Sequence, residues 1–178
     1  MAEISSGARS ADDSRTVLIW VVEGSWSAGV DVARRLGWAD DLVTLLYVVE
    51  EQVTAAAAGA YAGLFGSGRP ERDPSWRLAE ASSVAAEKLL CAAETRLGRP
   101  AQRIVRTGRI EREVVAAAAG VDLLIVARDG DLSRLGPRSL GRHTRFVVDH
   151  APCPVLLVWP DTTPSVESIP PPPEHPPR

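Results

Sequence analysis

A segment near the end of the chain gathers basic side chains that could bind an anion. Six of them lie between two apolar runs: Arg128, Arg134, Arg138, Arg142, His143 and Arg145. A helical pattern begins at Gly141, and a helix N-terminus carries about half a positive charge. Arginine also binds phosphate through paired hydrogen bonds. The segment therefore predicts an anion site; the alternative is that these arginines are solvated and pair with Asp129, Asp131 and Asp149.

Other residues near this segment invite a chemical role but have simpler interpretations. Trp26 could stack on a base, and packing or plugging a pocket is the alternative. His143 has no carboxylate or cysteine at the spacing of a metal site or a catalytic triad, which favours a surface residue at a helix start. The sequence also lacks the Walker, dinucleotide, zinc-protease and serine-hydrolase motifs. We therefore expect no enzyme activity and no metal.

Apolar runs and helical patterns alternate along the chain. Strands are predicted at Thr16–Glu23, Leu42–Glu50, Arg103–Thr107, Val121–Ala127 and Pro154–Trp159. Helices are predicted at Ser27–Trp38 with Ser25 as its cap, at Arg77–Leu97 ended by Gly98, at Ile110–Ala119 and at Gly141–His150. This alternation predicts an α/β fold, a doubly wound parallel sheet of five strands with helices on both faces. Ligands of such sheets bind at the carboxyl ends of the strands.

Composition excludes several classes of protein. The 178 residues are 45% hydrophobic and carry a net charge of −3, so nothing predicts general attraction to nucleic acid or membranes. No apolar run reaches the length of about 18 residues that a membrane span needs. The first residues lack the pattern of a signal peptide, so we expect the cytoplasm. The only cysteines, Cys91 and Cys153, are interpreted as unbridged thiols.

The chain divides into one domain and two tails. Residues 1–15 are small and polar, and we expect a disordered arm. Residues 16–160 form the domain, within which residues 51–77 show no clear period and are typical of a functional or mobile loop. Residues 161–178 are rich in proline and predict a solvated, disordered extension.

The domain resembles the universal stress protein family. The similarity is clearest where VDLLIVA precedes a glycine-bearing loop and GRHTRFVVDHAPCPVLLV, and VLIWVVEGS, LLYVVE and GRIEREVVAAA match earlier segments. The resemblance implies five parallel strands in the order 3-2-1-4-5 and a homodimer paired through the last strand, Val155–Trp159. By the same resemblance, Glu23 would face an adenine or ribose, and the backbone of Val48 would contact adenine. Taken by themselves, Glu23 would pair with an arginine and Val48 would be core.

The nucleotide-binding motif of the family, G-x2-G-x9-G-[ST], is broken in this chain. If Gly141 is the third glycine, Arg128 and Asp131 occupy the first two positions and Arg142 replaces the hydroxyl residue, with Thr144 as a plausible second hydroxyl. The motif uses glycines so that backbone N–H groups can approach phosphate closely. We therefore expect these side chains to project into that space, Asp131 to repel phosphate, and ATP binding to be weakened or lost.

Three functions follow as hypotheses. The first is a non-catalytic, cytoplasmic stress-response module with a degenerate ATP-binding loop and no cofactor. The second is a sensor of ATP or another adenine nucleotide in which arginines replace the glycine loop. The third is an adaptor whose proline-rich tail, residues 170–177, recruits a partner.

Overall fold

A computed structural model describes residues 14–36, 41–50 and 74–171. A single five-stranded parallel sheet carries the domain, in the order β3-β2-β1-β4-β5. Its strands are β1 (Thr16–Trp20), β2 (Leu42–Glu50), β3 (Gln102–Gly108), β4 (Leu123–Ala127) and β5 (Val155–Val158). The predicted fold class and strand order are confirmed, with β3 and β5 at the two edges of the sheet.

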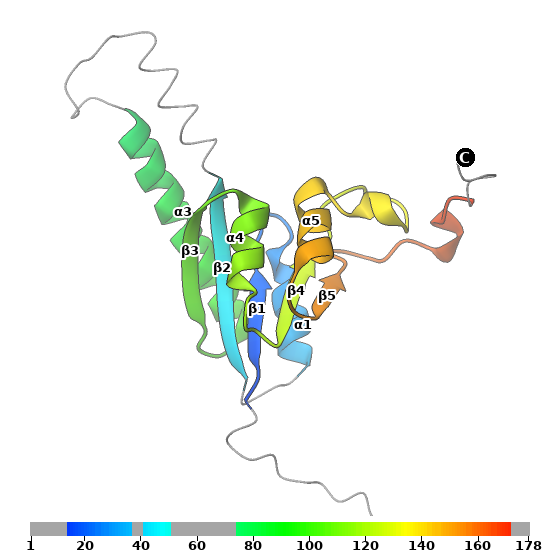
Figure 1. The fold of residues 1–178 in the computed structure, drawn as a ribbon, viewed down its shortest axis with the longest axis horizontal. Helices are drawn as coiled ribbons and strands as arrows, with labels where there is room; N and C mark the ends of the chain where they lie inside the picture. The colour runs from blue at the N-terminus through cyan, green and yellow to red at the C-terminus, as the bar shows by residue number, and fades with distance from the viewer. Residues whose placement is uncertain (1–13, 37–40, 51–73, 172–178) are drawn as a thin grey trace, which may run out of the picture.

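Helices cover both faces of the sheet (Figure 1). Helices α1 (Trp26–Arg35) and α3 (Pro74–Leu97) pack on one face, and α4 (Ile110–Ala117) and α5 (Arg142–His150) pack on the other. The carboxyl ends of the strands point toward the top of the view, where α4 and α5 begin. The long loop after β4 therefore lies at the edge of the sheet where open α/β sheets bind ligands.

The all-apolar strands follow from this double covering, because alternate side chains of a strand point to opposite faces. In β1 and just after it, Val17, Ile19 and Val21 pack under α1 and α3, whereas Leu18 and Trp20 pack under α4 and α5. These five side chains are all at least 95% buried. The two layers of core hold the sheet rigid and thereby fix the strand ends that carry the candidate site.

Several predicted boundaries were too long. β1 ends at Trp20, three residues before Glu23, because its pairing with β2 and β4 stops there. The chain then turns at Gly24, with a φ of 83°. Helix α1 ends at Arg35, and residues 37–40 lie outside the described ranges. The prediction that Ser25 caps this helix with its side chain was wrong: its hydroxyl is buried and makes no hydrogen bond within the described part of the chain.

The buried side of α5 carries one polar residue. Val147 and Thr144 are both buried there, whereas His150 is exposed. The His150 ring instead stacks on the Phe146 ring, with centroids 4.0 Å apart. The polar hydroxyl of Thr144 thus lies on the side facing the sheet.

The start of the proline-rich tail contacts the domain. Residues Val166–Ser168 form a 3-10 turn, and the Leu135 amide donates a hydrogen bond of 3.0 Å to the Ser168 hydroxyl. The segment therefore departs from a purely extended conformation here. Most of the predicted disordered arm (residues 1–15) and of the predicted loop (residues 51–77) lies outside the described residues. The last residues of that predicted loop belong to α3, which begins at Pro74.

Candidate functional site

The loop between β4 and α5 closes upon itself through its backbone. The Gly130 amide donates to the carbonyl of Ser139 at 3.0 Å, and the Asp131 amide donates to the carbonyl of Arg138 at 2.8 Å. A Cβ on Gly130 would lie 2.3 Å from the Arg138 carbonyl oxygen, so only glycine allows this approach. Two backbone N–H groups that a phosphate-binding loop would offer to a ligand are therefore already used within the loop.

Helix α5 begins against a carboxylate of the same chain. Gly141 is its N-cap, and its amide donates to Oδ1 of Asp129 at 2.7 Å. A Cβ on Gly141 would lie 2.8 Å from that oxygen, so glycine lets the carboxylate come close. An anion is stabilised at a helix N-terminus by the unpaired amides and the helix dipole. Asp129 thus occupies a place at which an external anion would bind.

Asp131 turns its carboxylate toward its own loop. Oδ1 accepts from the Ser133 amide at 3.1 Å and from the Ser133 hydroxyl at 2.5 Å, and Oδ2 accepts from Nε of Arg134 at 2.8 Å. These hydrogen bonds lower the pKa of Asp131 to about 2, Ser133 first and Arg134 next. The prediction that arginines of this segment pair with its aspartates is confirmed for Arg134 and Asp131.

Arg128 and Arg145 also hold the loop together. The guanidinium of Arg128 donates to the Ser139 hydroxyl and lies over the Trp159 ring at 4.7 Å from its centroid. The guanidinium of Arg145 donates to the Pro137 carbonyl at 2.7 Å. In this conformation, these side chains tie the segment 128–141 to β5 and α5 rather than forming one cluster around a ligand.

His143 has a carboxylate partner that the sequence did not reveal. Its Nδ1 lies 2.8 Å from Oε2 of Glu111, and the two side chains are 23% and 16% exposed. The carboxyl of Glu111 has a lowered pKa, chiefly because it accepts from its own backbone amide and also because of His143. The lack of a carboxylate at metal or triad spacing in the sequence therefore did not exclude a carboxylate partner for His143. The pair is 32 residues apart in the chain and forms only because α4 and α5 lie side by side.

The remaining predicted residues lie apart from this loop contact network. Glu23 is exposed just after β1, at the carboxyl edge of the sheet. Val48 is 7% exposed and belongs to the core under α4 and α5, which matches its interpretation as core. Thr144 is fully buried, and its hydroxyl has no hydrogen-bond partner among the described residues. Trp26 packs against the core under α1 and α3, with Arg96 at 5.9 Å from its ring centroid, which matches a packing role.

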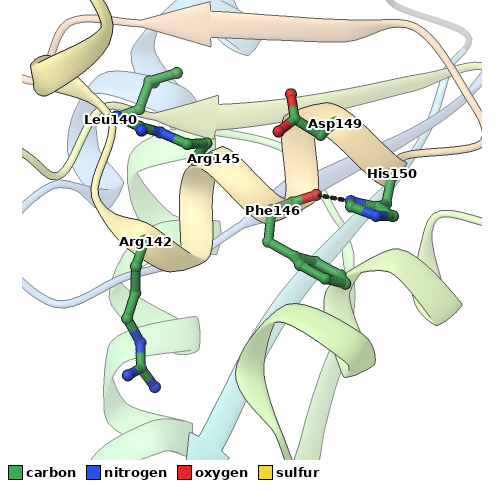
Figure 2. A pocket seen from close by; sticks show the side chains of 6 residues that line it. All are labelled: Leu140, Arg142, Arg145, Phe146, Asp149 and His150. Carbon is green, nitrogen blue, oxygen red and sulfur yellow. Dashed lines mark hydrogen bonds between the residues drawn. The ribbon is translucent and has the colours of Figure 1, made fainter.

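A shallow hollow of about 450 Å³ lies over the outer face of α5. Figure 2 shows its lining side chains spreading to two sides of the helix: Leu140, Arg145 and Asp149 on one, and Arg142, Phe146 and His150 on the other. Because these side chains diverge, they do not converge on one bound group. Within residues 14–36, 41–50 and 74–171, no three His, Cys, Asp or Glu side chains gather as metal ligands, and no helix has the length and apolar character to cross a bilayer.

Together, the sheet order and the loop after β4 define a class of protein, the doubly wound α/β domain. At the carboxyl edge of its sheet, where such domains bind ligands, lie that loop and the start of the following helix. The family model of the universal stress protein family matches residues 21–158. The chain therefore belongs to the universal stress protein family. No curated protein sequence matches the chain.

Solved structures share the fold at low sequence identity. Hypothetical protein MJ0577 superposes with a TM-score of 0.59 at 20% identity, covering 84% of this chain and 98% of its own. Hypothetical protein PH0823 gives 0.56 at 20% identity, covering 82% and 96%. A universal stress protein in complex with cAMP gives 0.49 at 19% identity, covering 83% and 98%. The first two of these matches establish the shared architecture.

Proposed function

We propose that this chain is a non-catalytic, cytoplasmic stress-response module in which the protein itself fills the phosphate-binding place of its family. The observation that carries the proposal is the contact between Asp129 and the first amide of α5, at 2.7 Å. Phosphate of a nucleotide would have to displace this carboxylate from the helix N-terminus or approach it as a like charge. The two free thiols are in keeping with a reducing compartment.

The loop backbone supports the same conclusion. The Gly130 and Asp131 amides are satisfied by the Ser139 and Arg138 carbonyls, so a phosphate could use them only if the loop opened. Opening would break two backbone hydrogen bonds, and each is worth roughly 0.5–1.5 kcal/mol. The loop is thus stable without a ligand, in contrast to a loop whose donors await phosphate.

The alternative is a sensor of ATP or another adenine nucleotide, with arginines in place of glycines. In its favour, Arg128 and Arg134 lie in the loop and Arg142 lies at the start of the helix that follows it. Guanidinium groups bind phosphate well. Against it, Arg134 is paired with Asp131, and Arg128 is held by Ser139 and Trp159. A nucleotide would have to break these contacts before it gained new ones.

Thermal shift with Mg-ATP decides between these two functions. For the native protein we expect no shift in Tm at sub-millimolar ATP, because ligand stabilisation of RT ln(1 + [L]/Kd) vanishes when the ligand does not bind.

Asp129→Ala removes the internal anion, and the variant is expected to gain a measurable shift in Tm with Mg-ATP. Asp149→Ala, an exposed acid on the same helix, is the matched control and should behave like the native protein. A rise of several degrees for the native protein would contradict the proposal, as would ATP-dependent phosphate release.

We further propose that the chain forms a homodimer through its last strand, Val155–Trp159. Strand β5 pairs with β4 alone and is an edge of the sheet, and Val155, Leu156 and Leu157 are only partly buried. Such an edge offers unpaired N–H and C=O groups to a second strand. Pairing there would extend the sheet and cover apolar side chains.

Two proline variants test this dimer. The Pro154 and Val158 carbonyls accept from β4, so by alternation the N–H of Leu157 points to the open edge. Leu157→Pro removes a donor from the open edge only, and edge strands tolerate proline. Light scattering should therefore show a folded monomer, whereas Leu156→Pro should disturb the β4–β5 pairing and lower Tm. A native monomer at micromolar concentration would refute the dimer.

A further inference from the structure

Glu111 and His143 connect the first turns of α4 and α5. Their 2.8 Å contact is between largely buried side chains, so it is shielded from solvent more than a surface ion pair. Arg109, just before α4, lies 3.8 Å from the other oxygen of Glu111. Since the pKa of Glu111 is lowered, chiefly by its own backbone amide, this carboxylate stays an anion well into acid.

The second nitrogen of the imidazole faces a cation. Nε of Arg142 lies 3.3 Å from Nε2 of His143. An arginine Nε–H can only donate, so Nε2 must accept with its lone pair. This assigns the neutral tautomer with its proton on Nδ1, donated to Glu111. The imidazole thus holds two partners at once, Glu111 on α4 and Arg142 on its own helix.

We propose that His143 is a proton-sensitive latch at the start of α5: neutral, it holds the Arg142 side chain, and protonated, it releases Arg142 while keeping Glu111. A proton added to Nε2 would face the Arg142 Nε–H, so two donors would point at each other. The added positive charge also repels the guanidinium and is opposed by the helix dipole, whereas Glu111 favours it. Histidine is the side chain whose charge ordinarily changes between pH 5 and 8.

The release changes the outer face of α5. Arg142 lines the hollow there, and Figure 2 shows it pointing away from Arg145 and Asp149. Protonation adds one positive charge to the helix start and frees a guanidinium on the same surface. The α4–α5 face would therefore present a different charge pattern in mild acid, whether or not a nucleotide binds to the protein.

Nuclear magnetic resonance of the full chain tests the latch. At pH 8, the nitrogen shifts of His143 should show the Nδ1–H tautomer, although free histidine favours Nε2–H. Between pH 8 and 5, the Arg142 Nε–H signal should move with the same midpoint as the His143 ring. An Nε2–H tautomer at pH 8, or an Arg142 signal that does not move, would overturn the proposal.

Three variants separate the latch from ordinary structural packing. His143→Asn keeps a donor near Glu111 but cannot titrate, so the Arg142 transition should be lost. Glu111→Ala removes the carboxylate that accepts from Nδ1 of His143, so the ring should return to the Nε2–H form that free histidine favours. Nε2 then no longer accepts from Arg142, and at pH 8 the Arg142 signal of this variant should resemble that of the native protein at pH 5. Glu111→Gln keeps an acceptor oxygen without charge and should retain the Nδ1–H tautomer. An Arg142 transition that persists unchanged in His143→Asn would refute the latch.

Discussion

The starts of α4 and α5 lie side by side at the carboxyl edge of the sheet, but the positive end of each helix dipole is balanced by negative charge from a different source. Helix α4 carries Glu111 and Glu113 in its first turn, which suits the positive end of a helix dipole. Helix α5 has no acidic residue in its first turn and begins with Arg142 and His143. The positive charge of Arg142 is opposed by the helix dipole at this end of the helix.

Helix α5 obtains its negative charge from elsewhere in the chain. Asp129, twelve residues before Gly141, accepts from the first amide, and Glu111, on α4, accepts from His143. The start of α4 is therefore stabilised by its own sequence, whereas the start of α5 is stabilised by tertiary contacts. The difference shows that a helix start with a poor local sequence can be supported by the fold around it.

Gly130→Ala should have the largest effect on this arrangement. Its Cβ would meet the Arg138 carbonyl at 2.3 Å, and backbone cannot move aside as easily as a side chain. We expect a loss of about 2–3 kcal/mol in the free energy of unfolding, measured by urea denaturation. Gly141→Ala is the comparison, because its Cβ meets only the end of the Asp129 side chain, which can turn away. A Gly130→Ala variant as stable as the native protein would contradict the close approach of the two loop segments.

Asp129→Ala should have an intermediate effect. It removes the acceptor at the N-cap of α5, and loss of a helix cap costs about 1 kcal/mol. Asp129→Asn keeps an acceptor oxygen and should lose less. Asp149→Ala, near the other end of the same helix, should change stability by less than about 0.5 kcal/mol. If the Asp129 and Asp149 variants unfold at the same urea concentration, α5 does not depend on this tertiary cap.

The smallest effect concerns the dependence of stability on pH. The pKa of Asp131 is about 2 in the folded protein, below the ordinary value of 3.8 for an aspartate, so the folded state favours the ionised carboxylate. Its contribution to stability is therefore present above about pH 4 and is lost as the pH falls toward 2. The difference in stability between the native protein and Asp131→Asn should shrink over this range. A difference that stays constant from pH 5 to pH 2 would show that Asp131 is not held by Ser133 and Arg134.

Much of the fold could be predicted from the sequence because its signals are local. The strand Leu42–Glu50 was predicted at its observed boundaries, and the helix that begins at Pro74 was predicted with its observed end, Leu97, before Gly98. Gly98 has a φ of 75°, a conformation that glycine adopts without strain. The boundaries that failed, such as the end of β1, depend on where neighbouring strands stop pairing.

The candidate site could be predicted only in its location. The cluster of basic residues and the break in the glycine motif pointed to the loop after β4. The sequence did not show that Asp129 reaches Gly141 or that Glu111 reaches His143, since nothing in a spacing of 12 or 32 residues indicates contact. These contacts depend on how the loop folds back and on how α4 packs beside α5.

By itself, the sequence determined the alternation of buried strands and amphipathic helices, because hydrophobic burial and glycine conformation act over a few residues. Only the tertiary structure decided which charges meet at the carboxyl edge of the sheet. Charge pairing acts through space, and at this edge it joins a loop, two helix starts and a strand end that are distant along the chain.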